Sequence, residues 1–317
     1  MKSTYRWQVI NNMCMSANLN LTDDMPSTEF LETIIAGKPV QVTLDYINDR
    51  IKVRSNNPED IDLLITYLNN LTLQNGFGKV ILIARKEDWE KTLPFGYILE
   101  AVNSGYFQGD PAYFMAKFYS KERANRNSLI LEDNILQSVL QHPLNPLPPR
   151  LPSGYVVREA VAEDVPQLVH LYEQIFTTYP SPITEPDYLQ HLINKYTFKI
   201  ILHAGKIVSA ASAETDLKNM AAELTDCACR PEYQSQGLMS YLIFSLELDL
   251  IRRGFKNLFT ICRSISTGIN TIFRKQGYTY GGRLINNCSI CGQFEDMNLW
   301  IKNPVNNLEY RTLPNHP

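Results

Sequence analysis

The sequence predicts an α/β (α+β) protein in which helices cover a mixed sheet. Strand and helix patterns follow one another through the second half of the chain in the order β-α-α-β-β-β-α-β-α-β-β. Within that order, residues 222–253 read as a strand, a polar turn with one glycine, and an apolar-striped helix. Five prolines between Pro143 and Pro152 separate this half from the first, because proline excludes helix and central strand.

The size and charge of the chain exclude several classes of protein. At 317 residues it is long enough for two domains with full cores. A net charge of −3 without a basic run argues against a nucleic-acid partner. No apolar stretch approaches the roughly 20 residues that span a bilayer, so we expect no membrane partner. Lys2 and Arg6 precede no apolar segment of the secretory type, so we expect a cytoplasmic protein; the oligomeric state is left open.

The six cysteines do not indicate metal or redox chemistry. Cys288 and Cys291 form one CxxC without a second pair at zinc-like spacing. Cys227, Cys229 and Cys262 fall inside apparent strands, where cysteine behaves as a small buried hydrophobic residue. We therefore predict no metal site.

The first half has recognisable elements after residue 30, and residues 1–30 are expected to be irregular. Asn57-Pro58 has the residue order that opens a helix, and Gly76 is typical of its end. The predicted elements are a hairpin of Val40–Tyr46 with Ile51–Val53, a helix through Leu71, a strand Val80–Ile83, a helix Asp88–Leu93, strands Tyr97–Val102 and Ala112–Phe118, and a helix Leu131–Leu140.

The second half resumes at Gly154. The predicted elements before the central strand are a strand Tyr155–Glu159, a helix from Ala162 through Phe176, a helix Asp187–Asn194, and a hairpin of Phe198–His203 with Ile207–Ala213. After the central strand come a helix Leu238–Arg253, a strand Leu258–Ile261, a helix Gly268–Lys275 and two last strands after Gly277-Tyr278.

The turn after the central strand is the strongest candidate for a binding site. Pro231 ends the strand, and Tyr233 to Gly237 lead into the helix that begins at Leu238. The first N–H groups of a helix are unpaired and lie at its positive end, so they bind anions such as phosphate. Gly237 has no Cβ, which allows a diphosphate to approach the backbone closely.

The pattern Pro231-x-Tyr233-Gln234-x-x-Gly237 resembles motif A of the GNAT acetyltransferases, which surrounds the diphosphate of acetyl-CoA. Met239 stands where that family usually has a small residue. The resemblance covers the succession of elements from Gly154 to Lys302 and implies acetyl-CoA as co-substrate, with pantetheine along the strand and diphosphate at the turn. The cofactor-binding residues that it implies are Cys227, Ala228, Cys229, Tyr233, Gln234, Ser235, Gln236, Gly237, Leu238, Met239 and Asn270.

Acetyl transfer to an amine needs a proton acceptor, since a lysine-like amine has a pKa of about 10.4 and must react in its neutral form. Glu223 and Asp226 are the acids in the central strand and are the predicted catalytic residues; their odd spacing predicts opposite faces. At the position where GNAT enzymes often have a proton-donating tyrosine, this chain has Phe273. Tyr280, Ser266, a cysteine or water are the remaining donors.

The first half repeats the order of the second. Gly76-Phe77 and Gly96-Tyr97 take the same places between elements as Gly254-Phe255 and Gly277-Tyr278. We therefore predict a partial GNAT-like domain at 1–142, a proline-rich linker at 143–153, a catalytic GNAT domain at 154–302 and a tail at 303–317. The first half has no Gln-x-x-Gly turn, so no cofactor is expected there.

Longer segments in both halves, among them ELTDCACRPEYQSQGLMSYLI and GYFQGDPAYFMAKF, resemble the β-lysine N6-acetyltransferase family. That resemblance implies acetylation of the terminal amine of β-lysine, a small-molecule substrate, to give a compatible solute. The predicted substrate-binding residues are Arg283, Asn286, Asn287, Glu295 and Asp296, with Glu295-Asp296 also readable as a solvated turn. A protein or peptide acetyltransferase and a catalytically silent acetyl-CoA-binding regulator remain open as alternatives.

Overall fold

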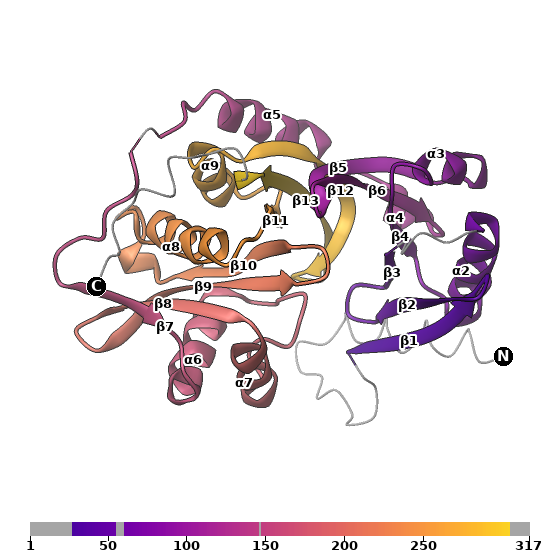
Figure 1. The fold of residues 1–317 in the computed structure, drawn as a ribbon. Helices are drawn as coiled ribbons and strands as arrows, with labels where there is room; N and C mark the ends of the chain where they lie inside the picture. The colour runs from indigo at the N-terminus through magenta and orange to yellow at the C-terminus, as the bar shows by residue number, and fades with distance from the viewer. Residues whose placement is uncertain (1–26, 55–59, 146, 305–317) are drawn as a thin grey trace. The chain divides into compact units, whose positions relative to one another are not determined.

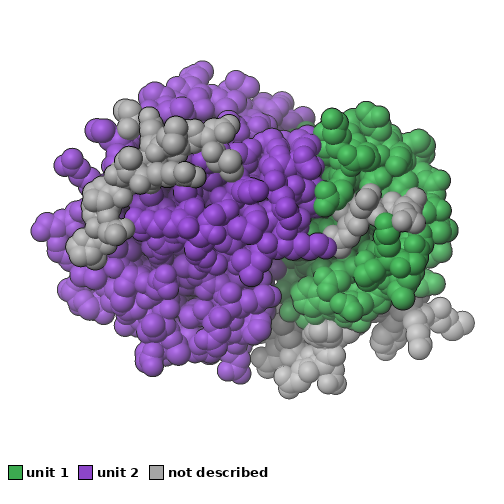
Figure 2. Space-filling model, viewed as in Figure 1, with its two compact units in different colours: residues 1–101, 113–126, 285–295 green, residues 102–112, 127–284, 296–317 purple. Residues whose placement is uncertain are grey.

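A computed structural model describes residues 27–54, 60–145 and 147–304. They form two compact units, coloured separately in Figure 2. Unit 1 comprises residues up to 101 together with 113–126 and 285–295, and unit 2 comprises 102–112, 127–284 and the residues from 296 onward. Unit 1 therefore contains one segment of the second half of the chain, 285–295, and unit 2 contains two segments that precede the predicted linker, 102–112 and 127–142.

Unit 1 is a sheet with helices that follow the predicted order. Its elements are β1 (Thr28–Ile35), β2 (Lys38–Asp45), β3 (Arg50–Arg54), α2 (Ile61–Asn75), β4 (Lys79–Ala84), α3 (Trp89–Thr92), β5 (Ile98–Phe107), β6 (Asp110–Phe118) and α4 (Lys121–Ala124). The strand order is β1-β2-β3-β4-β6-β5, and β3 pairs in parallel with β4. The expectation that residues 1–30 are irregular was wrong for the part that is described, because β1 begins at Thr28 and pairs with β2.

Unit 2 holds the strand, turn and helix that contain the predicted binding site. Its elements are α5 (Leu129–Leu140), β7 (Tyr155–Glu159), α6 (Val165–Ile175), α7 (Pro186–Lys195), β8 (Thr197–His203), β9 (Lys206–Asp216), β10 (Ala221–Cys229), α8 (Leu238–Arg252), β11 (Asn257–Arg263), α9 (Thr267–Lys275), β12 (Thr279–Ile290) and β13 (Gln293–Lys302). The strand order is β12-β13-β11-β10-β9-β8-β7, and β10 pairs in parallel with β11.

The two units share one topology. In unit 2, strands β8, β9, β10, β11, β13 and β12 lie in the same order as β1, β2, β3, β4, β6 and β5 do in unit 1. The pairing directions also agree, since each unit has two antiparallel pairs, then the parallel pair, then an antiparallel pair. The internal repeat predicted from the sequence is confirmed.

Helices cover both faces of the unit 2 sheet (Figure 1). On one face, α5, α8 and α9 pack on a hydrophobic cluster that includes Leu224, Leu242 and Trp300. On the other face, α6 and α7 pack on a cluster that includes Leu168, Leu189 and Ile200. Because both faces are buried, β8 and β9 read as nearly continuous apolar runs rather than as alternating ones.

The structure differs from the prediction at the start of α2 and in the unit to which α5 belongs. Asn57-Pro58, predicted to open a helix, lies outside the described residues, and α2 begins at Ile61 with Asp60 as its N-cap. Helix α5, which precedes the predicted linker at 143–153, belongs to unit 2. The division of the chain at that linker stays a proposal. Among the described residues, no helix is long and apolar enough to cross a bilayer.

Candidate active site

Strands β10 and β11 separate soon after they begin. In the described chain they are paired over three positions, from Ala221 to Glu223 on β10, while β10 stays paired with β9 as far as Cys229. From Thr225 onward, the backbone N–H and C=O groups on the β11 side of β10 are therefore not paired with β11. An unpaired edge offers N–H and C=O groups to an extended ligand. This edge contains Cys227 to Cys229, the predicted pantetheine-binding segment.

A β-bulge at Asp226 changes which side chains face which layer. Asp226 has a φ of 51°, and the pairing with β9 shifts between Thr225 and Ala228. Before the bulge Leu224 packs on the α8 side; after it Cys227 and Cys229 pack there, while Ala228 joins the cluster under α6 and α7. The bulge thus directs the two cysteine side chains towards α8.

The bulge also corrects the prediction that Glu223 and Asp226 lie on opposite faces. Ala222 and Leu224 belong to the cluster on the α8 side, so Glu223 between them faces the α6–α7 side. The Asp226 carboxylate accepts hydrogen bonds from Tyr179 and Ser212 on that same side. The rule that side chains alternate between the two faces of a strand failed here, because the bulge at Asp226 inserts an extra residue into β10.

Asp226 is held in a closed set of hydrogen bonds. Its carboxylate accepts from Ser212 Oγ at 2.6 Å and Tyr179 Oη at 2.9 Å, and its carbonyl accepts from Tyr172 Oη at 3.2 Å. Burial raises the pKa of Asp226, and the two hydrogen bonds to its carboxylate oppose that shift. A non-glycine residue at positive φ costs on the order of 1 kcal/mol, so these bonds stabilise a strained backbone. This geometry suits a residue that fixes the bulge.

Glu223 has a different position. It is half-buried and is the last β10 residue paired with β11, opposite Phe259. On its other side it pairs with Glu214 of β9. Its carboxylate therefore lies near the point at which the two strands separate, on the face of the sheet that is covered by α6 and α7.

The turn after β10 leaves the start of α8 open. Gly237 is the N-cap with a φ of 79°, and no side chain caps the helix. A Cβ added to Gly237 would meet no atom within 4 Å. Glycine at this position is therefore not required by packing within the protein; it suits the left-handed backbone and a ligand that approaches from outside.

In unit 1, the N-terminus of the equivalent helix, α2, is capped by a side chain. Asp60 caps α2, its carboxylate accepting hydrogen bonds from the N–H groups of Asp62 and Leu63 at 3.1 Å each. That carboxylate occupies the donors that a phosphate would need and repels a second anion. Of the two related helices, only α8 therefore presents an open, uncapped N-terminus.

Aromatic and amide side chains hold the turn in place. Gln234 Nε2 donates to the Cys229 carbonyl at 3.2 Å, and Tyr155 Oη donates to Gln236 Oε1 at 2.6 Å. His203 stacks on Tyr155 with ring centroids 4.6 Å apart, and its Nδ1 lies 3.3 Å from Tyr233 Oη. Strands β7 and β8 thus support the turn through these contacts.

The two helix residues in the predicted phosphate site point away from it. Leu238 and Met239 are buried in the hydrophobic cluster under α8. The long side chain of Met239, which stands where the family usually has a small residue, is therefore accommodated in the core and does not crowd the phosphate site. The backbone N–H groups of the first turn of α8 remain the predicted ligands. Ser235 has a φ of 60°, which shapes the turn before Gly237.

Asn270, a predicted cofactor-binding residue, is fully engaged in hydrogen bonds inside the protein. Its Oδ1 accepts from Asn298 Nδ2 at 2.9 Å and Trp300 Nε1 at 2.8 Å. Its Nδ2 donates to the carbonyls of Arg263 and Ser266. Its side chain is completely buried, so it organises the end of β11, and a contact with cofactor stays a prediction.

Two of the predicted substrate residues, Arg283 and Asp296, lie in a buried polar cluster of unit 2. Arg283 contacts Glu132 at 3.3 Å and Asp133 at 2.7 Å through Nη1, and Asn298 Oδ1 at 3.2 Å through Nε. Burial, then the neighbouring Asp296, raises the pKa of Glu132 to about 7. Asp296 is only 4% exposed, so its interpretation as part of a solvated turn was wrong.

The other three predicted substrate residues belong to unit 1. Asn286 has a φ of 44° and donates through Nδ2 to the carbonyls of Arg123 and Asn125. The Asn287 carbonyl accepts from Arg50. Glu295, within β13, is half-buried. The structure gives these residues structural contacts in unit 1, and a substrate role for them stays a prediction.

The residues considered as proton donors are buried to different degrees. Phe273 is completely buried and packs edge-on against Tyr278, so a hydroxyl is absent at that position. Tyr280 is half-buried and lies edge-on to Trp300. Burial raises the pKa of the Cys227 and Cys262 thiols, which keeps both protonated. The described ranges contain no group of three or more His, Cys, Asp or Glu side chains that could hold a metal ion.

The residues that support these groups were not predictable from the sequence. Tyr172, Tyr179 and Ser212 carry no local motif, because their partner Asp226 is 14 to 54 residues away along the chain. Glu132 reads as an ordinary polar position in the predicted helix Leu131–Leu140. Only the fold brings these side chains to the strand ends.

Comparisons with known proteins agree with this geometry. The model of the acetyltransferase (GNAT) family matches residues 165–278, from the start of α6 to the beginning of β12. That range contains β10, the turn and α8, which form the candidate site.

Three curated relatives match much of the chain. A β-lysine N(6)-acetyltransferase from Methanococcus maripaludis is 35% identical over 276 residues, which covers 86% of this chain and 99% of the relative. The N-acetyltransferase YodP of Bacillus subtilis is 34% identical over 71% of this chain and 82% of its own length. A β-lysine N(6)-acetyltransferase from Methanosarcina mazei is 33% identical over 71% of this chain and 91% of its own length. With its fold, open helix N-terminus and full-length relatives, the chain belongs to the GNAT family of N-acetyltransferases, in the group that includes the β-lysine N6-acetyltransferases.

Proposed function

We propose that this protein is a cytoplasmic enzyme that transfers an acetyl group from acetyl-CoA to the terminal (ε) amine of β-lysine and so produces N6-acetyl-β-lysine, a compatible solute. The observation that carries the proposal is the uncapped N-terminus of α8 at Gly237, directly after a strand edge that β11 leaves free. The substrate is supported by the two relatives named as β-lysine N(6)-acetyltransferases.

The turn and strand residues would hold the co-substrate. The N–H groups at the start of α8 bind the diphosphate, and Gly237 lets it approach. The backbone of Cys227 to Cys229 pairs with the pantetheine arm as an added strand would. Acetyl-CoA supplies an activated acetyl group as a thioester.

Glu223 is the proposed proton acceptor. Presenting a lysine-like amine in its neutral form at pH 7 costs about 4–5 kcal/mol, and a carboxylate near the amine lowers that cost by taking the proton. Glu223 lies where β10 and β11 separate, while Asp226 is occupied by Tyr179 and Ser212. The new C–N bond replaces the C–S bond, and the departing sulfur takes a proton from solvent or from Tyr280.

The test is acetyl transfer from labelled acetyl-CoA to β-lysine, α-lysine and a diamine without a carboxylate. A site that hydrogen-bonds the 3-amino group leaves polar groups unpaired with the wrong isomer, so we expect at least a tenfold preference in kcat/KM for β-lysine over α-lysine. The diamine should be a weaker substrate still, and β-lysine already acetylated on its terminal amine should be inert. Equal kcat/KM for all three amines would contradict β-lysine as the substrate.

A further inference from the structure

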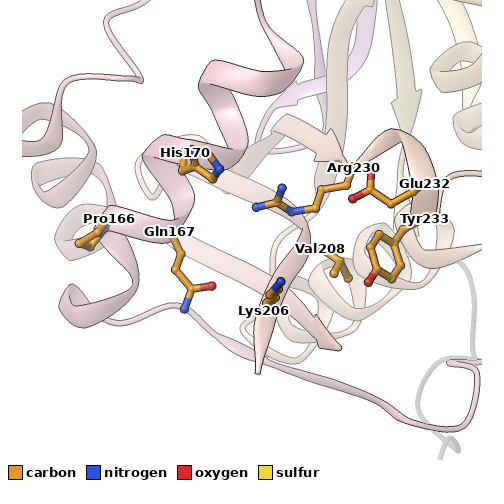
Figure 3. Close-up of a pocket in the computed structure, with 8 residues that line it drawn as sticks. All are labelled: Pro166, Gln167, His170, Lys206, Val208, Arg230, Glu232 and Tyr233. Carbon is orange, nitrogen blue, oxygen red and sulfur yellow. The ribbon is translucent and has the colours of Figure 1, made fainter. Parts of the chain in front are cut away.

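Unit 2 contains a pocket of about 480 Å³ to which the proposed function has so far given no role. It lies between the first turns of α6 and the adjoining ends of β9 and β10 (Figure 3). The residues that line it are Pro166, Gln167, His170, Lys206, Val208, Arg230, Glu232 and Tyr233.

The pocket is mainly basic. Lys206 and Arg230 contribute permanent positive charges, and His170 lies on the helical wall. Lys206 is exposed, and its ammonium group makes no hydrogen bond or ion pair with any residue that the structure describes. Glu232 is the single acidic residue of the lining, and it is exposed. Such a pocket favours an anion with more than one charge.

The guanidinium of Arg230 is already oriented. Nε donates to the Ile207 carbonyl at 2.9 Å, and Nη1 donates to Gln174 Oε1. These two bonds fix the plane of the group, and Figure 3 shows the side chain extending towards α6. A fixed guanidinium loses little side-chain entropy on binding and presents its remaining N–H groups as a fork that suits phosphate.

The pocket and the proposed diphosphate site share a wall. Tyr233 lines the pocket and directly precedes Gln234, the first residue of the turn. The Tyr233 N–H donates to the Arg230 carbonyl at 2.9 Å, and the Arg230 N–H donates to the Val208 carbonyl at 2.9 Å. A group bound at Arg230 therefore lies beside the start of the turn.

We propose that this pocket binds the 3′-phosphate of acetyl-CoA, with Lys206 and Arg230 as its ligands. The inference rests on the proposed function, because it adds a second phosphate subsite to the co-substrate. Only one ribose separates the 3′-phosphate from the diphosphate, so the two subsites must be neighbours, as the pocket and the turn are. A phosphate monoester carries a charge of about −1.5 to −2 at pH 7, which matches two cationic side chains.

The test compares acetyl-CoA with acetyl-3′-dephospho-CoA. The wild-type enzyme should prefer acetyl-CoA by at least tenfold in kcat/KM. Lys206→Gln should reduce that preference at least fivefold through a higher KM for acetyl-CoA, with kcat within twofold and the dephospho substrate unaffected. Glu232→Gln should increase the preference, because it removes the one repulsive charge. Lys218→Gln, an exposed lysine in the turn after β9, is the matched control and should change nothing.

An unchanged preference in an active Lys206→Gln enzyme would overturn the proposal while leaving acetyl transfer intact. Free inorganic phosphate provides the second arm. If it competes with acetyl-CoA more strongly than with the dephospho substrate, and Lys206→Gln removes the difference, the subsite is supported. Equal inhibition with both substrates would show a separate anion site and overturn the assignment. Absence of transfer to any amine would instead refute the proposed function.

Discussion

At the scale of single residues, Glu132 is a buried carboxyl group that should make the stability of the protein depend on pH. It is 3% exposed, and burial together with the neighbouring Asp296 raises its pKa to about 7. A carboxyl group whose pKa is raised in the folded state favours its protonated form there. The folded protein therefore binds the extra proton between the ordinary pKa and about 7, and the free energy of unfolding should fall as pH rises through that window.

We expect Glu132→Gln to remove this pH dependence. The wild-type protein should lose on the order of 1–3 kcal/mol of unfolding free energy between pH 5 and pH 8 relative to the variant, whose amide mimics the protonated acid. Urea denaturation at four pH values measures this. Asp133→Asn, an exposed neighbour that also contacts Arg283, is the control and should follow the wild type. Parallel pH curves for wild type and Glu132→Gln would show that Glu132 ionises normally.

At the scale of elements, the two acidic residues of β10 have different positions and different expected roles. Asp226 stabilises the bulge through three hydrogen bonds, and Glu223 lies at the end of the pairing with β11. The bulge then turns Cys227 and Cys229 towards α8 and leaves their edge unpaired with β11. Asp226 therefore stabilises the shape of the strand, and Glu223 is the carboxylate that we propose as the proton acceptor.

Substitution of each acid should separate these roles. Glu223→Gln should lower kcat by about 100-fold or more, remove the rise of rate with pH on the acidic side, and leave the unfolding free energy within about 0.5 kcal/mol. Asp226→Asn should cost about 1–3 kcal/mol of unfolding free energy, because one buried donor loses a charged acceptor. Steady-state kinetics and urea denaturation of both variants measure the difference. A stable but inactive Asp226→Asn enzyme, beside an active Glu223→Gln enzyme, would reverse the assignment.

The elements themselves were largely predictable, and the site only in part. Apolar periodicity placed α2, α8 and the central strands, and the Gly-Phe and Gly-Tyr pairs predicted the repeat that the strand orders confirm. The bulge was not predicted: Thr225 and Asp226 break the alternation of polar and apolar residues, but the extra residue shows only in the pairing with β9. Strand β1 was missed because its exposed Phe30 and Ile34 blur the usual alternation.

At the scale of the whole molecule, the first half of the chain contributes a segment to unit 2. Residues 102–112 belong to that unit, where Asn103 and Asn257 exchange side-chain hydrogen bonds of 3.0 and 2.7 Å while fully buried. Asn257 stands at the start of β11, beside its three-residue pairing with β10. The first half therefore helps to fix the strand pair that opens into the candidate site.

Asn103→Ala should lower the unfolding free energy by about 2 kcal/mol, since the buried amide of Asn257 loses one of its two side-chain partners in the described chain and keeps only Asn303. Ser104→Ala, at the next and exposed position, should cost less than about 0.5 kcal/mol. Urea denaturation of the intact chain compares the two. If Asn103→Ala proved no more destabilising than Ser104→Ala, the segment would contribute little to unit 2.

The repeat also predicts a difference between the units, because Asp60 closes α2 while Gly237 leaves α8 open. The intact chain should therefore bind one acetyl-CoA. Gly237→Glu places a carboxylate where the diphosphate should lie, and like charges in close contact cost several kcal/mol. Gly37→Glu is the matched control: it has a similar φ of 76° and equally open surroundings, in the turn between β1 and β2.

Titration calorimetry with acetyl-CoA tests this central claim most directly. We expect one site per chain, a loss of affinity of about 100-fold or more in Gly237→Glu, and wild-type affinity in Gly37→Glu, with all three proteins folded by circular dichroism. Unchanged affinity in a folded Gly237→Glu protein, or two sites per chain, would contradict the assignment of acetyl-CoA to the turn before α8.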